Sequence, residues 1–102
     1  MPSRFVRQEL EKSIEKKCRL IAEERGGALI KTVALGKPGF PDRMLLMSGW
    51  GCFIEFKRPG GKPTDLQTHW MKVLERSKFR VHTIYSAEAF SQILDDHGAR
   101  RT

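Results

Sequence analysis

Cysteine is scarce and long apolar runs are absent, and both shortages narrow the classes of protein to which this chain can belong. The two cysteines, Cys18 and Cys52, are too few and too far apart for a zinc site, so we expect both to be buried and unreactive. The longest apolar run, Met44 to Met47, is far shorter than the ~20 residues that cross a bilayer. The first residues also lack the apolar segment of a secretory signal. We therefore expect a cytoplasmic protein with no membrane partner.

Acidic residues are outnumbered, since 12 Asp and Glu stand against 19 Lys and Arg and give a net charge of +7 over 102 residues. Such a small and basic chain is expected to bind a polyanion, with nucleic acid as the first choice. The alternative is that the excess charge only keeps the protein in solution. A chain of this length can bury one modest core, so residues 1–102 are expected to form a single domain.

Hydrophobic periodicity and turn residues predict an α/β protein with the element order αβββαβ and a short last helix. The first helix is expected over residues 4–25, with Ser3 as its N-cap and Gly26-Gly27 at its end. Ser48-Gly49 is expected to join two strands into a hairpin. The predicted strands are residues 28–34, 44–47, 50–57 and 80–85, and the predicted later helices are one capped by Thr64 that ends near Ser77 and a short one capped by Ser86, before a polar tail from His97.

Two short motifs, Pro41-Asp42 and Glu55-Phe56-Lys57, are the most informative feature of the sequence. Side chains alternate along a strand, so Glu55 and Lys57 point from one face. A carboxylate in this apolar strand needs a partner, which Lys57, another cation or a metal ion can supply. Pro41 restricts the backbone before Asp42, so pairing of the two strands would bring Asp42 to Glu55. Two carboxylates beside a lysine can hold a divalent cation for phosphodiester cleavage.

Each motif also has an ordinary structural explanation. A Glu and a Lys two residues apart are common on a solvated strand face, and an Asp after proline often bonds its own backbone in a turn. Glu11 and Glu15, four residues apart on the first helix, can supply a third acid, but either one alone is better explained as a solvated side chain. Gln67 fits a capping box with Thr64, and it can equally point into the acidic site.

Basic residues gather in the loops and strand ends around these motifs. Glycine and lysine in a loop allow backbone and cation to approach phosphate closely. Basic charge around an acidic pocket favours a nuclease over a passive binder. The expected DNA contacts are Lys31, Lys37, Arg43, Arg58 and Lys62.

Taken together, these motifs resemble the active-site set of the PD-(D/E)xK nuclease superfamily, and more narrowly the stand-alone VRR-NUC domains of phages and bacteria. The resemblance covers most of residues 11–95, and it implies a restriction-endonuclease-like core, which is a mixed central sheet flanked by helices. The matching stretches are residues 13–16, 26–27, 36–42, 53–57 and 59–67.

The resemblance also assigns roles to individual residues. Lys57 would position the attacking water and stabilise charge on the phosphate, and Gln67 would be an additional polar residue of the site. Glu15 is preferred to Glu11 as the acid of the first helix. The implied ligands of Mg²⁺ or Mn²⁺ are the carboxylates of Glu15, Asp42 and Glu55 and the backbone carbonyl of Phe56.

The activity that the resemblance implies is that of a metal-dependent, structure-selective DNA endonuclease in the cytoplasm of a phage-infected or bacterial host. A Holliday-junction resolvase that acts in recombination as a homodimer is the favoured form, with Phe5, Trp50 and Phe79 as candidates for apolar surface between subunits. The alternatives are a flap, nicking or general duplex endonuclease, and a non-catalytic basic domain that binds DNA on the same fold.

Overall fold

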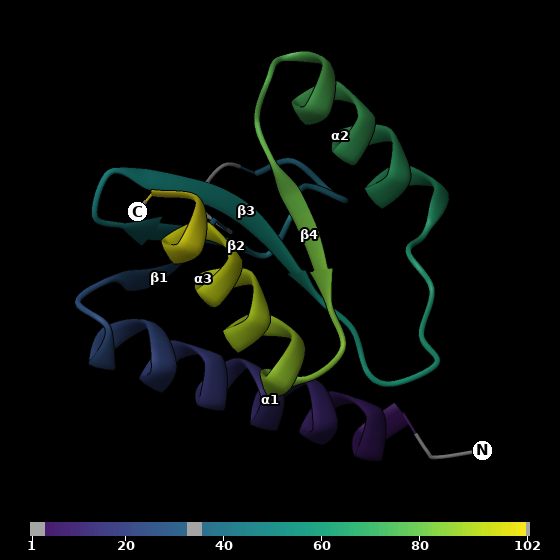
Figure 1. Ribbon diagram of the computed structural model, residues 1–102. Helices are drawn as coiled ribbons and strands as arrows, with labels where there is room; N and C mark the ends of the chain where they lie inside the picture. The colour runs from purple at the N-terminus through teal and green to yellow at the C-terminus, as the bar shows by residue number, and fades with distance from the viewer. Residues whose placement is uncertain (1–3, 33–35, 102) are drawn as a thin grey trace.

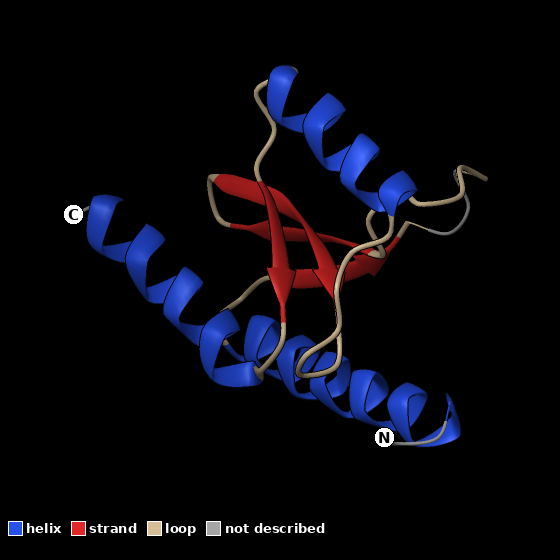
Figure 2. Ribbon diagram, turned by 90° about the vertical axis from the view of Figure 1, so that its right-hand side faces the viewer, coloured by secondary structure: helices blue, strands red, loops and turns tan. Residues whose placement is uncertain are grey.

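The computed structural model describes residues 4–32 and 36–101 and shows a β-sheet between two layers of helices (Figure 1). Figure 2 shows two helices, α1 and α3, on one face of the sheet and α2 on the other. This arrangement confirms the predicted α/β architecture with a mixed sheet flanked by helices. The elements in chain order are α1 (Arg4–Glu24), β1 (Ala28–Lys31), β2 (Arg43–Met47), β3 (Trp50–Phe56), α2 (Asp65–Arg76), β4 (Val81–Ile84) and α3 (Ala87–Arg101).

The four strands lie in the order β1-β2-β3-β4. The first three are antiparallel, with Lys31 paired to Arg43 and Arg43 paired to Ile54. β4 is parallel to β3, and the register pairs Glu55 with Thr83. A parallel neighbour requires a crossover connection, which α2 provides. β3 is therefore a central strand, with β2 on one side and β4 on the other.

The hydrophobic core lies between the sheet and the layer made by α1 and α3. Both cysteines belong to it as free thiols, which confirms the sequence-based expectation. Burial raises the pKa of Cys18 to about 12 and that of Cys52 to about 11, so neither thiol ionises near neutral pH. The buried core residues are Cys18, Ala22, Leu29, Leu45, Cys52, Ile54, Phe56, Ile84, Phe90 and Leu94.

An aromatic cluster holds α2 and the loop before β2 against the other face of the sheet. The Phe40 ring contacts Phe53 of β3 at a centroid distance of 5.3 Å and Trp70 of α2 at 5.6 Å. The indole N–H of Trp70 donates to the carbonyl of Pro38 at 3.1 Å. Gly39 has a φ of +82°, and a Cβ there would lie 2.5 Å from a leucine side chain of α2, so this position requires glycine. These contacts fix the loop that leads into β2.

The last helix is longer than predicted. A polar tail was expected from His97, whereas α3 extends to Arg101, so that prediction is wrong. The physical reason is a tertiary contact: the His97 imidazole stacks on the Trp50 indole at 3.8 Å and holds the end of α3 against the start of β3. The sequence after His97 also contains no proline that would end a helix.

Other boundaries differ from the prediction by a few residues. The strand expected over residues 28–34 ends at Lys31, and residues 33–35 lie outside the described residues, as does Ser3, the expected N-cap. Thr64 caps α2 as predicted. No helix within residues 4–32 and 36–101 is long and apolar enough to cross a membrane.

The alternation in β2 allows a direct test of the two faces. Leu45 is 0% exposed and its neighbour Leu46 is 43% exposed. Leu45→Ala should lower the free energy of unfolding by about 2–5 kcal/mol, because it removes buried methyl groups and leaves a cavity in the core. Leu46→Ala is the matched control and should cost roughly 0.5 kcal/mol. Urea unfolding of both variants measures the difference, and equal losses would contradict the assigned faces.

Candidate active site

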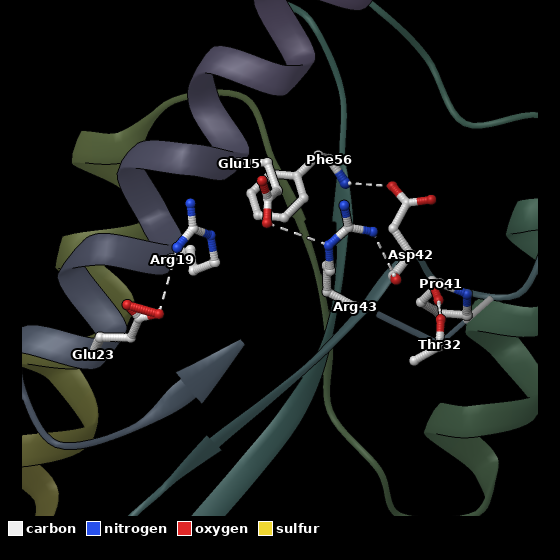
Figure 3. Close-up of polar contacts among 8 residues, drawn as sticks. All are labelled: Glu15, Arg19, Glu23, Thr32, Pro41, Asp42, Arg43 and Phe56. Carbon is white, nitrogen blue, oxygen red and sulfur yellow. Dashed lines mark hydrogen bonds and ion pairs between the residues drawn. The ribbon is translucent and has the colours of Figure 1, made fainter. Parts of the chain in front are cut away.

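Asp42 and Glu55 lie side by side across two strands, which is the juxtaposition that the two sequence motifs predict. Continuing the β2–β3 register by one residue places Asp42 opposite Glu55. The Oδ2 atom of Asp42 accepts a hydrogen bond from the backbone N–H of Phe56 at 3.2 Å (Figure 3). The backbone carbonyl of Asp42 accepts a second one from the N–H of Thr32 at 3.0 Å. Asp42 is therefore held by the chain on both of its sides.

Glu55 is a buried acid with an unsatisfied oxygen. The residue is 2% exposed, and its Oε2 has no hydrogen-bond partner among the described residues. Burial, and then the neighbouring Asp42, raise the pKa of Glu55 from 4.5 to about 9, while Lys57 acts in the opposite direction. A divalent cation would give the Glu55 oxygen the partner that the described residues do not supply and would offset the repulsion between the two carboxylates, because hard cations prefer carboxylate oxygens. The residues present therefore fit such a cation.

Lys57 completes the group at the end of β3. It follows Glu55 by two residues, so strand alternation directs both side chains to one face. Its backbone N–H donates to the carbonyl of Ile84 at 3.0 Å, which continues the β3–β4 pairing and fixes its position. Its positive charge lowers the pKa of Glu55, against the larger effects of burial and Asp42. The structure thus brings two acids and one lysine together.

Arg43 is the partner of the acid that the resemblance favours on the first helix. Its Nε atom lies 3.5 Å from Oε1 of Glu15 in a largely buried ion pair, and its Nη1 donates to the carbonyl of Asp42 at 3.0 Å. Figure 3 shows the guanidinium between Glu15 and Asp42. Glu11 instead accepts a bond from the backbone N–H of Arg58 at 3.4 Å. In the described parts of the chain, no three acidic, histidine or cysteine side chains gather as a preformed ligand set.

A cleft of about 700 Å³ separates α1 from the acidic end of the sheet. Asp42, Phe56 and both helix acids face it. Its walls also carry more cations than acids, so a phosphate could enter it beside Asp42. The lining residues are Glu11, Lys12, Glu15, Lys16, Arg19, Lys31, Asp42, Arg43 and Phe56.

The five predicted DNA contacts divide into three groups. Lys31 and Arg43 line this cleft and also a second hollow of about 570 Å³, which Lys37 lines as well. Arg58 meets the cleft through its backbone bond to a helix acid. Lys62 is exposed and lines neither space. Two of the five therefore lie directly beside the carboxylates.

α1 contributes three cations to the cleft that were not among the predicted DNA contacts. Lys12, Lys16 and Arg19 follow one another at intervals of four and three residues, which places them on one helix face. That spacing was available in the sequence and could have identified them. They form a basic wall opposite the sheet.

Gln67 is used by the helix cap, one of the two roles that the sequence left open. The side-chain Oε1 of Gln67 accepts a hydrogen bond from the backbone N–H of Thr64 at 2.8 Å, and the backbone N–H of Gln67 donates to the Thr64 hydroxyl at 3.2 Å. This is a complete capping box at the start of α2. Its catalytic role stays a prediction.

Relatives of the chain agree in family and fold. The VRR-NUC domain family matches residues 3–88. "Putative nuclease p44" of Acyrthosiphon pisum secondary endosymbiont phage 1 is 47% identical over 67 residues, which are 63% of this chain and 67% of that protein. A solved structure described as a VRR_NUC domain superposes with a TM-score of 0.75 at 23% identity and covers 83% of this chain and 94% of its own. The likeness to that structure concerns the fold.

The burial of Glu55 predicts an unusual pH dependence of stability without metal. Its pKa is 4.5 in ordinary surroundings and about 9 in the folded chain, so between these values the folded state keeps a proton that the unfolded state has lost. The free energy of unfolding should therefore fall as the pH rises through this window. Glu55→Gln has no charge to bury and should raise the free energy of unfolding at pH 8 in EDTA by about 1–3 kcal/mol.

Thermal unfolding at pH 5 and pH 8 measures this effect. The control is Glu75→Gln, which changes an exposed acid of α2 and should leave the wild-type pH dependence intact. A Glu55→Gln variant that is less stable than wild type at pH 8 in EDTA would show that the carboxylate is already well partnered.

Proposed function

We propose, from the premise that this chain belongs to the VRR-NUC family of nuclease domains, that it is a metal-dependent endonuclease that hydrolyses phosphodiester bonds in branched DNA. One observation carries the proposal: the buried Glu55, with its unpartnered oxygen, lies opposite Asp42 at the end of β3, and Asp42 lines two hollows that also carry cations. An unpaired acid in an apolar strand weakens a fold, so its presence points to a ligand.

The proposed cofactor is Mg²⁺, with Mn²⁺ as a substitute. The carboxylates of Asp42 and Glu55 and the backbone carbonyl of Phe56 would hold it, because oxygen donors suit both ions. The cation would supply Lewis-acid stabilisation of charge on the phosphate. Glu15 would contribute from α1 after its ion pair with Arg43 opens.

The side chains of this site have separate tasks in the proposed hydrolysis. Lys57 positions the attacking water and stabilises the negative charge that develops on the phosphate. The backbone N–H of Phe56 keeps the Asp42 carboxylate oriented. Gln67 would act on the substrate through its amide nitrogen, while its oxygen accepts a hydrogen bond within the helix cap.

The proposed partner is DNA, held in the cleft by its phosphates. Lys12, Lys16 and Arg19 would contact the backbone from α1, and Lys31 and Arg43 from the sheet. Lys37, Arg58 and Lys62 would contact DNA farther from the carboxylates. Such contacts release counterions, so affinity should decrease with rising salt concentration.

The finer proposal is a Holliday-junction resolvase that acts as a homodimer in the host cytoplasm. A two-fold dimer presents two equal sites and suits paired cuts across a four-way junction. Large exposed apolar side chains are available for subunit contact, among them Ile30 and Leu46. Of the predicted candidates, Phe79 is exposed but lies beside Lys78 and Arg80, and Trp50 is half-buried against His97. The side chain of the remaining candidate, Phe5, lies outside the described part of the structure. A flap, nicking or general duplex endonuclease is the alternative within this class, and a non-catalytic DNA-binding domain is the alternative outside it.

A cleavage assay tests both the reaction and the substrate. Matched four-way junction, flap, splayed-arm and linear duplex DNA are incubated with the protein in Mg²⁺ or Mn²⁺. We expect paired, symmetric nicks in the junction. Lys57→Ala should reduce kcat by about 10²–10³-fold, because it removes a charge aimed at the transition state, while the Kd for junction DNA changes little.

Lys72→Ala is the matched control, since it removes an exposed lysine of α2 that is not among the proposed DNA contacts. It should cut at nearly the wild-type rate. Cutting of a different DNA by the wild type would keep the nuclease and change its substrate. Binding without any metal-dependent cutting would favour the non-catalytic domain.

Metal binding should also be visible without DNA. Only the folded state gathers Asp42 and Glu55, so Mg²⁺ at ten times its Kd should add about 1.4 kcal/mol to the free energy of unfolding. For a domain of this size that corresponds to roughly 7 °C in Tm. Differential scanning fluorimetry measures the shift, which the double variant Asp42→Asn/Glu55→Gln should lose. An equal shift in the double variant would place the cation elsewhere.

A further inference from the structure

A third hollow, of about 420 Å³, is also basic and lies at the opposite end of β3 from the carboxylates. Trp50 contributes to it from the start of β3, His97 from α3, and Lys78, Phe79 and Arg80 from the connection between α2 and β4. The His97 ring of α3 stacks on Trp50, so this part of α3 lies at the end of the sheet where β2 turns into β3. From Trp50 to the acid of β3 is five residues, or about 17 Å of strand.

Lys78 occupies a backbone conformation that favours glycine. Its φ is +72°, and it is the one non-glycine residue with positive φ in the described parts of the chain. It follows the last turn of α2, where the N–H of Phe79 donates to the carbonyl of Leu74 at 2.9 Å. Glycine is the usual residue at such a helix end because it has no Cβ. A lysine kept here at a conformational cost suggests that its side chain has a use.

Arg80 is an exposed cation whose direction is fixed by neighbouring rings. Its Nη1 lies 3.2 Å from Nε2 of His97, and the His97 ring in turn stacks on Trp50. Phe79, between the two cations in sequence, is 55% exposed and rests one ring edge on Phe53. The hollow therefore presents two cations and an exposed aromatic ring.

The chemistry of this hollow fits nucleic acid better than a second protein subunit. No ion pair of the described residues joins Lys78 or Arg80 to a carboxylate, although Glu75 lies nearby. Burying two such cations against another copy of the chain would desolvate them without compensation. Phosphate groups compensate them directly, and an exposed aromatic ring can contact a sugar or an unpaired base.

We propose that Lys78, Phe79 and Arg80 bind a second arm of branched DNA, while the arm that is cut lies in the cleft at the other end of the sheet. This proposal rests on the proposed function, which supplies branched DNA as the substrate. The added contact would make the affinity for branched DNA higher than that for a linear duplex. Arms of a junction diverge, so one can reach each end of the sheet. A linear duplex that occupies the cleft has no second arm for the hollow.

The double variant Lys78→Gly/Arg80→Gln tests this proposal by fluorescence anisotropy in EDTA, where binding is measured without cleavage. We expect about tenfold weaker binding to a four-way junction and less than twofold change for a linear duplex of one arm's length. The slope of log Kd against log salt for the junction should decrease by about 1.8, or about 0.9 for each lost phosphate contact.

Two further variants separate binding from folding. Lys78→Gly alone suits the positive φ, so its Tm should not fall although its junction affinity does. Lys17→Ala removes an exposed cation of α1 that lines none of the three spaces, and it should bind the junction like wild type.

Three results would overturn the proposal: junction affinity within twofold of wild type, equal losses on junction and duplex, or a change of oligomeric state of the double variant in sedimentation. A wild type that cuts no DNA would refute the proposed reaction and leave this binding comparison intact. A negative result here would leave the roles of the carboxylates unchanged.

Discussion

The pairing of β2 with β3 is the constraint on which the rest of the site depends. The register sets Asp42 against Glu55, and the bond from the Phe56 N–H to Asp42 closes the pair. A slip of one residue would separate Asp42 from Glu55 and turn the side chains of one strand to the opposite face of the sheet. The aromatic contacts of Phe40 hold the loop that enters β2 and so stabilise this register on the β2 side. The parallel partner β4 stabilises it on the other side.

Electrostatic balance at the site comes from a cation of the protein itself. Arg43 contacts Glu15 and the backbone of Asp42, so it joins α1 to the sheet across the cleft. The same guanidinium lines the space into which a phosphate would enter. A group that stabilises the fold through one partner can therefore exchange that partner for an incoming anion. Such an exchange would couple substrate entry to the position of the helix acid.

The local sequence was sufficient to predict the two strand motifs and the cap of α2. Alternation along β3, the restricted backbone at Pro41 and the Thr64–Gln67 spacing each act within a few residues, so they can be interpreted without the tertiary structure. The choice between Glu11 and Glu15 could not be made in this way, because it depends on where α1 crosses the sheet. The length of α3 depends on a contact between His97 and Trp50, which are distant in sequence. The spacing of Lys12, Lys16 and Arg19 is local and indicates a basic face of α1, although these residues were not among the predicted DNA contacts.

The two cysteines give the molecule its own reporters of motion. Cys18 belongs to α1 and Cys52 to β3, so they stand on opposite sides of the interface between helix layer and sheet. Because both thiols are buried and resist ionisation, a thiol reagent can reach them only when that interface opens. The labelling rate of the unaltered chain then measures how often α1 lifts from the sheet, and a ligand that bridges the two across the cleft would slow it.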